Sequence, residues 1–252
     1  MPNKYDLLNR FFAENSRLAL AFSGGVDSAY LLCAAVRAGC DVRPYYVKTA
    51  FQPEFEFADA KRLANELGVE MHVIEKDILS EESVHSNPSN RCYFCKRALF
   101  TEIIAAAQRD GYSLLVDGTN ASDDADDRPG MRALRELEVR SPLREAGLTK
   151  DEIRALSKEA GLFTWNKPAY ACLATRIPTG TAIDPDMLQR IERAEDALRA
   201  MGFSDLRVRV MGASAKLQLP EAQFALAVQK RSEILNALAG DFDAVLLDMK
   251  AR

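Results

Sequence analysis

The chain has 252 residues, of which 48% are hydrophobic and 28% charged, an ordinary balance for a globular protein. This length fits one large domain, or one domain with a small companion. The net charge of −4 and a pI of about 5.4 argue against a broad basic surface for nucleic acid. No apolar run approaches the roughly 20 residues that span a bilayer, and the start lacks the layout of a secretory signal. We therefore expect a cytoplasmic protein that does not act at a membrane.

Strand-like and helix-like segments alternate over the first two thirds of the chain. Apolar runs predict strands at 17–22, 41–49, 70–74 and 112–118, and helices are predicted at 28–38, 54–67, 92–109 and 149–160. The last of these helices begins with the capping-box spacing of Thr149 and Glu152. The alternation predicts an α/β fold with a doubly wound, mainly parallel sheet covered by helices on both faces.

The composition changes after the last of these helices. Residues 163–185 carry three prolines and no helical period, which is typical of a long functional loop or a hinge. A helix at 186–201, strands at 205–212 and 215–219, another helix and a last strand at 243–249 follow. We expect two domains, 1–166 and a smaller α/β domain at 167–252 that binds substrate and serves oligomerisation.

A glycine-containing turn, Ser23-Gly24-Gly25-Val26-Asp27-Ser28, follows the first predicted strand and opens the first predicted helix. Ligands of open parallel sheets bind at such strand ends, where helix N–H groups and the helix dipole favour anions. Gly24 and Gly25 would permit close approach and positive φ, and Ser23 and Ser28 add hydroxyl donors. The lysine of the common phosphate loop is absent, and an ordinary capped turn is the alternative.

The string SGGVDS resembles the PP-loop of the N-type ATP pyrophosphatases, a superfamily that transfers AMP and releases pyrophosphate. The resemblance implies ATP as cosubstrate, with Asp27 in the pyrophosphate and Mg²⁺ environment. A second match is Asp117–Asp123, which resembles the strand-four loop of the same group and implies ATP contacts by Gly118, Thr119, Asn120 and Asp123. Mg²⁺ between phosphates needs one or two carboxylates. In the acidic run of Asp123, Asp124, Asp126 and Asp127 we favour Asp123, with a solvated loop as the alternative; Arg128 faces the ATP or caps the loop.

Three cysteines have a pattern that fits metal or sulfur chemistry. Cys92 and Cys95 form a C-x-x-C pair, and Cys172 stands far from them in the proline-containing segment. A structural zinc needs a fourth ligand, for which His85 is the nearest histidine, whereas three cysteines leave one iron of a [4Fe-4S] cluster open. Unconnected thiols are the third reading, and spacing does not decide between them.

The string from Asp117 through "SPLREAGLTKDEIRALSKEAGLFTWNKPAYACLATRIPTG" to "RVRV" resembles the LarE family. These ATP-dependent sulfur transferases serve nickel-pincer cofactor synthesis. The resemblance implies adenylylation of a carboxylate of a pyridinium-3,5-dicarboxylate mononucleotide and replacement of AMP by sulfur, with Cys172 at the position of the sulfur donor. The added C-x-x-C favours members with a three-cysteine [4Fe-4S] cluster and a bound sulfide over members that sacrifice one cysteine. A homo-oligomer, with a hexamer as one form, is also implied.

Arg207 and Arg209 stand two apart in a predicted strand and therefore share one face about 7 Å apart. Such a pair can grip a phosphate, although a solvated strand face has the same pattern. The resemblance implies a substrate-phosphate site here, and Arg176 near Cys172 is a further candidate.

Other functions stay open at this point: a PP-loop tRNA thiolase, an adenylating amide-forming ligase of the NAD synthetase type, and a non-catalytic nucleotide- or metal-binding module. The sequence also leaves open the source of sulfide, the carboxylate that reacts first and the oligomeric state.

Overall fold

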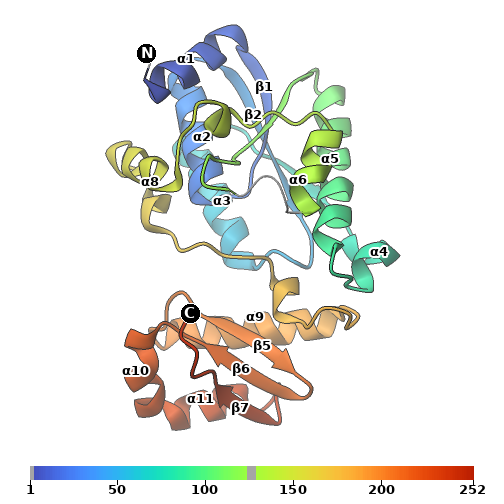
Figure 1. Cartoon of the computed structure of the whole chain (residues 1–252), viewed down its shortest axis with the longest axis vertical. Coiled ribbons are helices and arrows are strands. Elements are labelled where there is room, and N and C mark those ends of the chain that lie inside the picture. The colour runs from blue at the N-terminus through green and yellow to red at the C-terminus, as the bar shows by residue number, and fades with distance from the viewer. Residues whose placement is uncertain (1–2, 124–128) are drawn as a thin grey trace. The chain divides into compact units, whose positions relative to one another are not determined.

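The computed structural model describes residues 3–123 and 129–252, which divide into two units (Figure 1). The first unit is Met1–Ile78 with Asn90–Lys167, and the second is Leu79–Ser89 with Pro168–Arg252. The boundary near residue 167 lies where the composition changes. Residues 79–89 belong to the second unit although they lie between the two halves of the first, so no single cut of the chain separates the two.

The first unit is built on a four-stranded, fully parallel sheet. Its strands are β1 (Arg17–Ala21), β2 (Asp41–Lys48), β3 (His72–Glu75) and β4 (Leu115–Asp117), in the order β3-β2-β1-β4. From β1 the chain moves outward through β2 to β3 and then returns to place β4 on the other side of β1. The direction therefore reverses between β1 and β4, and in such sheets the carboxyl ends of the strands at this reversal form the ligand crevice.

Helices cover both faces of this sheet, which confirms the predicted doubly wound α/β fold. Successive residues of β1 point to opposite faces, so Leu18 and Leu20 join one buried cluster while Ala19 joins another. The first cluster contains side chains of α1, α2, α3 and α8, and the second contains side chains of α5. The helices of this unit are α1 (Lys4–Glu14), α2 (Val26–Arg37), α3 (Glu54–Glu66), α5 (Arg91–Arg109), α6 (Pro129–Glu136), α7 (Pro142–Glu145) and α8 (Lys150–Glu159).

Besides the four-residue helix α7, two helices of the first unit were not expected. Helix α1 is capped by Asn3 and buries Leu8, Phe11 and Phe12 in the core. Helix α6 begins at Pro129, where the sequence pattern predicted no helix. Both are short amphipathic helices whose stability comes from the tertiary contacts of one apolar face, and such contacts are invisible to local pattern.

The second unit contains a small mixed sheet with helices packed on it. Its strands, in the order β5-β6-β7, are β5 (Arg207–Met211), β6 (Ser214–Gln218) and β7 (Ala244–Leu247); β5 pairs antiparallel with β6, and β7 parallel. The single helix expected before β7 is two helices with a short 3₁₀ turn. The proline-containing segment 163–185 holds only short 3₁₀ turns. The helices of this unit are α4 (Glu82–His85), α9 (Pro185–Ala200), α10 (Phe224–Gln229) and α11 (Arg231–Leu238). Across the described residues, no helix has the length and apolarity to cross a membrane.

At the amino ends of the parallel strands, opposite the ligand crevice, a polar cluster gathers around Asp110. Its carboxylate accepts hydrogen bonds from the Tyr45 hydroxyl at 2.8 Å and from Arg43 at 3.2 Å, and lies 3.2 Å from His72 Nδ1. The bond from Tyr45, followed by those from Arg43 and His72, holds the pKa of Asp110 below its usual value. The cluster therefore joins the starts of β2 and β3 to the segment that leads into β4.

We expect Asp110→Asn to lower the free energy of unfolding at pH 7 and to weaken its dependence on acid pH. A carboxyl whose pKa is depressed by folding stabilises the fold above its unfolded pKa, near 3.8, and loses this contribution as pH falls through the folded value. Urea unfolding of both proteins at pH 7 and near pH 3 checks this. The same difference in free energy of unfolding between the two proteins at both pH values would contradict the depressed pKa of Asp110.

Candidate active site

Two loops meet at the carboxyl ends of β1 and β4. Residues 22–25 connect β1 to α2, and residues 118–123 follow β4. A Cβ atom at Gly118 would lie 2.8 Å from the backbone nitrogen of Ser28. Because real Cβ contacts are never so short, only glycine allows the strand-four loop to rest directly on the first turn of α2. The structure thus brings together the two motifs that the sequence assigns to ATP.

The two glycines of the PP-loop have different roles. Gly24 has φ +71° and its missing Cβ would lie 2.9 Å from the Cβ of Ala60 in α3, so both its conformation and its close approach require glycine. Gly25 has φ −78° and is the N-cap of α2. The expectation of positive φ is therefore right for Gly24 and wrong for Gly25, because the chain has already turned at Gly24 and enters the helix from an extended conformation.

We expect Gly24→Ala to lower the free energy of unfolding by about 2 kcal/mol, since a left-handed non-glycine residue costs roughly 1–3 kcal/mol before any clash with Ala60 is counted. Gly25→Ala is the matched control, because its φ is ordinary and its Cβ would be 3.4 Å from the Ser23 hydroxyl. Thermal and urea unfolding compare the two. Equal losses of unfolding free energy in the two variants would contradict the different requirements for glycine at positions 24 and 25.

The serines close the PP-loop on itself. The Ser23 and Ser28 hydroxyls lie 3.1 Å apart, the Ser28 hydroxyl donates to the Gly25 carbonyl at 3.2 Å, and the Gly25 N–H donates to the Ser23 hydroxyl at 3.3 Å. No side chain in the part of the chain that the structure describes caps the N-terminus of α2. The first turn therefore keeps N–H groups and a positive dipole end for an anion, beside a preformed loop.

Asp27 occupies the first turn of α2 and forms an ion pair that local sequence did not reveal. Lys150, the first residue of α8, donates to Asp27 Oδ2 at 2.6 Å. The other oxygen, Oδ1, is buried and has no hydrogen-bond partner among the described residues. Burial raises the pKa of Asp27, and Lys150 opposes this rise. A buried carboxylate oxygen without a hydrogen-bond partner, at the edge where parallel sheets bind ligands, fits a ligand of a hard cation such as Mg²⁺.

Lys150 owes its position to the capping box that was predicted for α8. Thr149 accepts the Glu152 N–H, and Glu152 accepts the Thr149 N–H at 2.8 Å, so the helix begins where the sequence indicated. The Lys150 N–H donates to the Ser122 hydroxyl of the strand-four loop at 3.0 Å. A lysine thus lies beside the PP-loop, and it comes from a helix 123 positions further along the chain than Asp27.

Internal hydrogen bonds shape the strand-four loop. Buried Asp117 accepts from the Thr119 hydroxyl at 2.6 Å and from the Ser141 hydroxyl at 2.7 Å, and Asp123 accepts the Asn120 N–H at 3.0 Å. Thr119 and Asn120 are themselves buried. Asp117 therefore stabilises the loop, while half-buried Asp123 lies near enough to Asp27 to raise its pKa. Asp124, Asp126, Asp127 and Arg128 lie outside the described residues.

The C-x-x-C pair lies in the first two turns of α5, beside the strand-four loop. Cys92 is exposed and Cys95 half-buried, and a spacing of three places both on one side of the helix. Cys92 lines a cavity of about 310 Å³ together with Thr119 and Asp123. Other lining residues are Lys96, Pro129, Gly130 and Met131. The structure thus connects the C-x-x-C pair to the second ATP motif, which sequence separation had not indicated.

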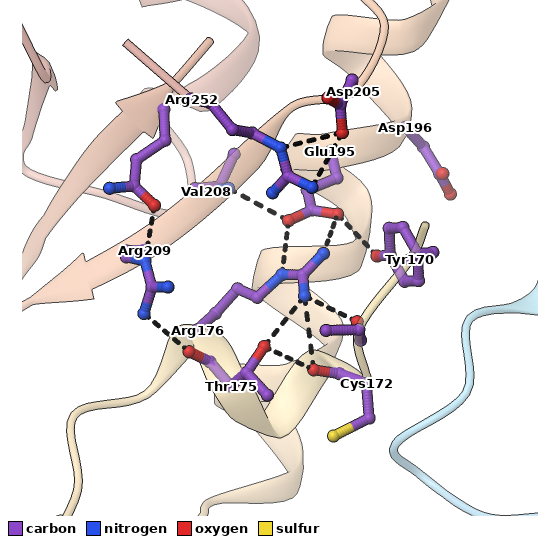
Figure 2. A network of polar contacts seen from close by, with 12 residues as sticks. Tyr170, Cys172, Thr175, Arg176, Glu195, Asp196, Asp205, Val208, Arg209 and Arg252 are labelled. Carbon is purple, nitrogen blue, oxygen red and sulfur yellow. Dashed lines mark hydrogen bonds and ion pairs between the residues drawn. The ribbon is translucent and has the colours of Figure 1, made fainter. Parts of the chain in front are cut away.

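Cys172 belongs to the second unit, where it begins the 3₁₀ turn Leu173–Arg176. Its carbonyl accepts the Thr175 N–H at 3.0 Å and the Thr175 hydroxyl at 2.8 Å. The half-buried side chain extends away from these contacts, and its sulfur points away from the polar network in Figure 2. The turn therefore holds the backbone of Cys172, while the sulfur points away from these hydrogen bonds.

Arg176 lies within this network rather than on the surface. It is 1% exposed and forms a two-pronged ion pair with buried Glu195 of α9, at 2.8 and 3.1 Å. Its remaining nitrogen donates to the Ala171 carbonyl at 2.6 Å and to the Cys172 carbonyl at 3.3 Å. Burial disfavours its charge, but the pair with Glu195 prevails and raises the pKa of the guanidinium. In this geometry Arg176 holds the cysteine turn, so a phosphate would have to displace existing bonds.

Arg207 and Arg209 lie on the half-buried side of β5, while Val208 and Val210 are buried, as the alternation predicted. Arg209 donates to the Gln218 side chain at 2.6 Å and to the Thr175 carbonyl at 2.9 Å. The Nε of Arg207 is buried without a hydrogen-bond partner in the described parts of the chain. Burial, followed by the charges of neighbouring arginines with Arg252 first, lowers the pKa of Arg207. This crowded cationic cluster fits a bound anion such as phosphate.

Within either unit, the described residues contain no group of three or more His, Cys, Asp or Glu side chains arranged as a metal site. Cys92 and Cys95 belong to the first unit and Cys172 to the second. The three-cysteine set is thus distributed over both units, and its assembly stays a prediction.

The sheet order, the PP-loop and the strand-four loop define the class of this protein as the PP-loop ATP pyrophosphatases. No family model matches the chain, but individual relatives do. The chain is 31% identical to argininosuccinate synthase of Haloarcula marismortui, over 59% of this chain and 38% of the relative. It is 25% identical to the tRNA-specific 2-thiouridylase MnmA of Thermotoga petrophila, over 60% of this chain and 54% of the relative.

A more similar relative identifies the family. The chain is 34% identical to the pyridinium-3,5-bisthiocarboxylic acid mononucleotide synthase of Lactiplantibacillus plantarum, over 82% of this chain and 76% of the relative. The chain belongs to this LarE family and is an ATP-dependent sulfur transferase.

Proposed function

We propose that this protein adenylylates a carboxylate of a pyridinium-3,5-dicarboxylate mononucleotide and replaces AMP with sulfur, giving a thiocarboxylate for nickel-pincer cofactor synthesis. The observation that carries the proposal is the pair Arg207 and Arg209 on β5, which can bind an anion and lies next to the Cys172 turn. The same chain has a complete PP-loop. One part of the protein then recognises a small phosphorylated substrate and presents a thiol, while the other activates ATP.

In the first step, a substrate carboxylate oxygen attacks the α-phosphorus of ATP, and pyrophosphate leaves. Ser23, Gly24, Gly25 and Ser28 would bind the pyrophosphate together with the N-terminus of α2. Lys150 would join them once Asp27 binds the cation. The strand-four loop, through Gly118, Thr119 and Asn120, borders the nucleotide. Asp27 and Asp123 would hold Mg²⁺, which neutralises charge on the phosphates.

In the second step, sulfur attacks the acyl carbon and AMP leaves with the former carboxylate oxygen. Adenylylation is needed because a carboxylate oxygen alone is a poor leaving group, whereas a thiolate or sulfide is a strong nucleophile near neutral pH. Arg207 and Arg209 are proposed to hold the substrate phosphate. Arg176, predicted from sequence for the same phosphate, is better placed to position the cysteine turn.

Cys92, Cys95 and Cys172 are proposed as the three protein ligands of a [4Fe-4S] cluster. The pair on one side of the first two turns of α5 suits two neighbouring ligands, with exposed Cys92 accessible. Such a cluster, when bound, offers an open iron for an exogenous sulfide and so permits repeated turnover. The alternative is that Cys172 gives up its own sulfur once and becomes dehydroalanine.

The first experiment incubates the chain with ATP, Mg²⁺, the dicarboxylate mononucleotide and sulfide, and follows AMP, pyrophosphate and thiocarboxylate by mass spectrometry. Equal amounts of AMP and thiocarboxylate support the proposal. AMP with an amide product, or sulfur appearing only in added tRNA, would move the assignment to the ligase or thiolase reading.

The sulfur source is decided on anaerobically purified, reconstituted protein. About four irons with matching acid-labile sulfide, lost in Cys92→Ser, support the cluster. Zinc or no metal, with loss of one sulfur from Cys172 after a single turnover, supports the sacrificial route.

A homo-oligomer is also proposed, supported by apolar side chains that are exposed on the second unit: Met211, Val228, Leu235, Leu246 and Met249. Light scattering of the full chain tests it.

A further inference from the structure

Glu195 makes contacts that none of the roles above requires. It is fully buried in the middle of α9, a helix whose other buried residues are apolar. A buried carboxylate costs much desolvation energy unless it is paired and hydrogen-bonded. Nothing in the local pattern of α9 marks this residue, and the reason for its burial lies in what its two oxygens bind.

The two oxygens join three separate segments of the second unit (Figure 2). Oε1 accepts from Arg176 Nε at 2.8 Å and from the Val208 N–H at 3.0 Å. Oε2 accepts from the Tyr170 hydroxyl at 2.5 Å and from Arg176 at 3.1 Å. Arg199 reaches the same oxygen from the partly exposed side at 3.2 Å. One carboxylate thus holds the chain before Cys172, the turn after Cys172, and β5.

The contact with Val208 is informative because β5 is an edge strand, paired on one side only with β6. Its outward N–H groups lack strand partners, and Glu195 satisfies one of them. Val208 stands between Arg207 and Arg209, so this bond acts on the backbone from which both arginines project. A second link runs back to the turn, from Arg209 to the Thr175 carbonyl at 2.9 Å.

We propose that Glu195, with Tyr170, is a positioning residue that joins the Cys172 turn to the Arg207–Arg209 strand, so that the thiol and the phosphate-binding arginines keep one fixed separation. The proposal rests on the proposed function and adds residues that neither contact the substrate nor carry sulfur. A substrate anchored by its phosphate must bring its acyl carbon to the sulfur, and misplacement by 1 Å costs up to about 100-fold in rate.

Glu195→Gln tests the contacts that join the Cys172 turn to β5, with almost no change in the shape of the side chain. The amide keeps an acceptor oxygen for one set of donors but places an N–H₂ group against Arg176 or Tyr170 and removes the charge. We expect KM for the mononucleotide to rise about 10-fold and the rate of single-turnover sulfur transfer to fall about 10-fold. Both change because the Cys172 turn and the arginines of β5 shift relative to each other. Tyr170→Phe, which removes one hydroxyl, should give the same pattern with about 3-fold effects.

The second readout needs no turnover. The rate at which iodoacetamide alkylates Cys172, read from its peptide by mass spectrometry on the full chain, should rise in both variants because the turn loosens. Arg193→Met is the matched control: it breaks an ion pair between exposed Arg193 of α9 and Asp241, a pair that includes no residue of the turn or of β5. It should leave KM, transfer rate and alkylation unchanged.

A purely structural role predicts a different result, a lower melting temperature with unchanged KM and unchanged alkylation in the folded fraction. That result for Tyr170→Phe overturns the proposal, and it decides the matter if Glu195→Gln does not fold. If the unaltered protein forms no thiocarboxylate, the proposed function has failed; alkylation still decides whether Glu195 holds the turn.

Discussion

Cys172→Ala is expected to form AMP from ATP and the mononucleotide while making no thiocarboxylate. The PP-loop and the strand-four loop lie in the first unit, whereas Cys172 lies in the second, so its removal leaves the machinery for adenylylation intact. Both sulfur routes need this residue, either as cluster ligand or as donor. Thiocarboxylate should therefore fall to the level without enzyme, a loss of at least about 1,000-fold, as when a nucleophile is removed.

The measurement is a rapid-quench assay of AMP and thiocarboxylate in the same samples. Cys33→Ala is the control, because this cysteine is buried in the core of the first unit and burial raises its pKa. It should retain sulfur transfer. Normal thiocarboxylate formation by Cys172→Ala would remove the central assignment of this site.

Asp27→Ala is expected to abolish the earlier step, with AMP formation reduced about 100-fold or more, since it removes the charge that we propose to act directly on the cation and phosphates. Lys150→Met leaves Asp27 in place but removes its partner, and should weaken ATP binding more than it slows chemistry. Measuring KM for Mg-ATP and the maximal AMP rate separates the two variants. Asp27→Ala with an unchanged AMP rate would show that the cation is held elsewhere.

The pH dependence of the same step follows from the raised pKa of Asp27. An acid with a raised pKa keeps its proton to higher pH, so Mg-ATP binding should weaken on acidification at a pH above 3.8, the ordinary value for aspartate. In Lys150→Met this loss should begin at still higher pH, because the lysine favours the ionised form. An onset that does not move would mean that another group controls binding.

Much of the local geometry of the proposed ATP site could be predicted because its parts are short. Ser23–Ser28 and Asp117–Asp123 each lie within one turn between a strand and the next element, and the order of a parallel sheet brings both to one edge. Local backbone geometry also made the capping box of α8 and the alternation of Arg207 and Arg209 predictable. The positive φ assigned to Gly25 was wrong, because one left-handed residue, Gly24, suffices for the turn.

The sequence by itself determined the α/β class, the two nucleotide loops, the C-x-x-C pair and the arginine pair. Each is specified by residue spacing within a single element, and backbone periodicity converts spacing into a shared face. Only the tertiary structure decided that Lys150 meets Asp27, that Cys92 borders the strand-four loop, and that Glu195 joins the cysteine turn to β5. These contacts link segments far apart in the chain, and they form only when packing brings the segments together and burial makes an unpaired charge costly.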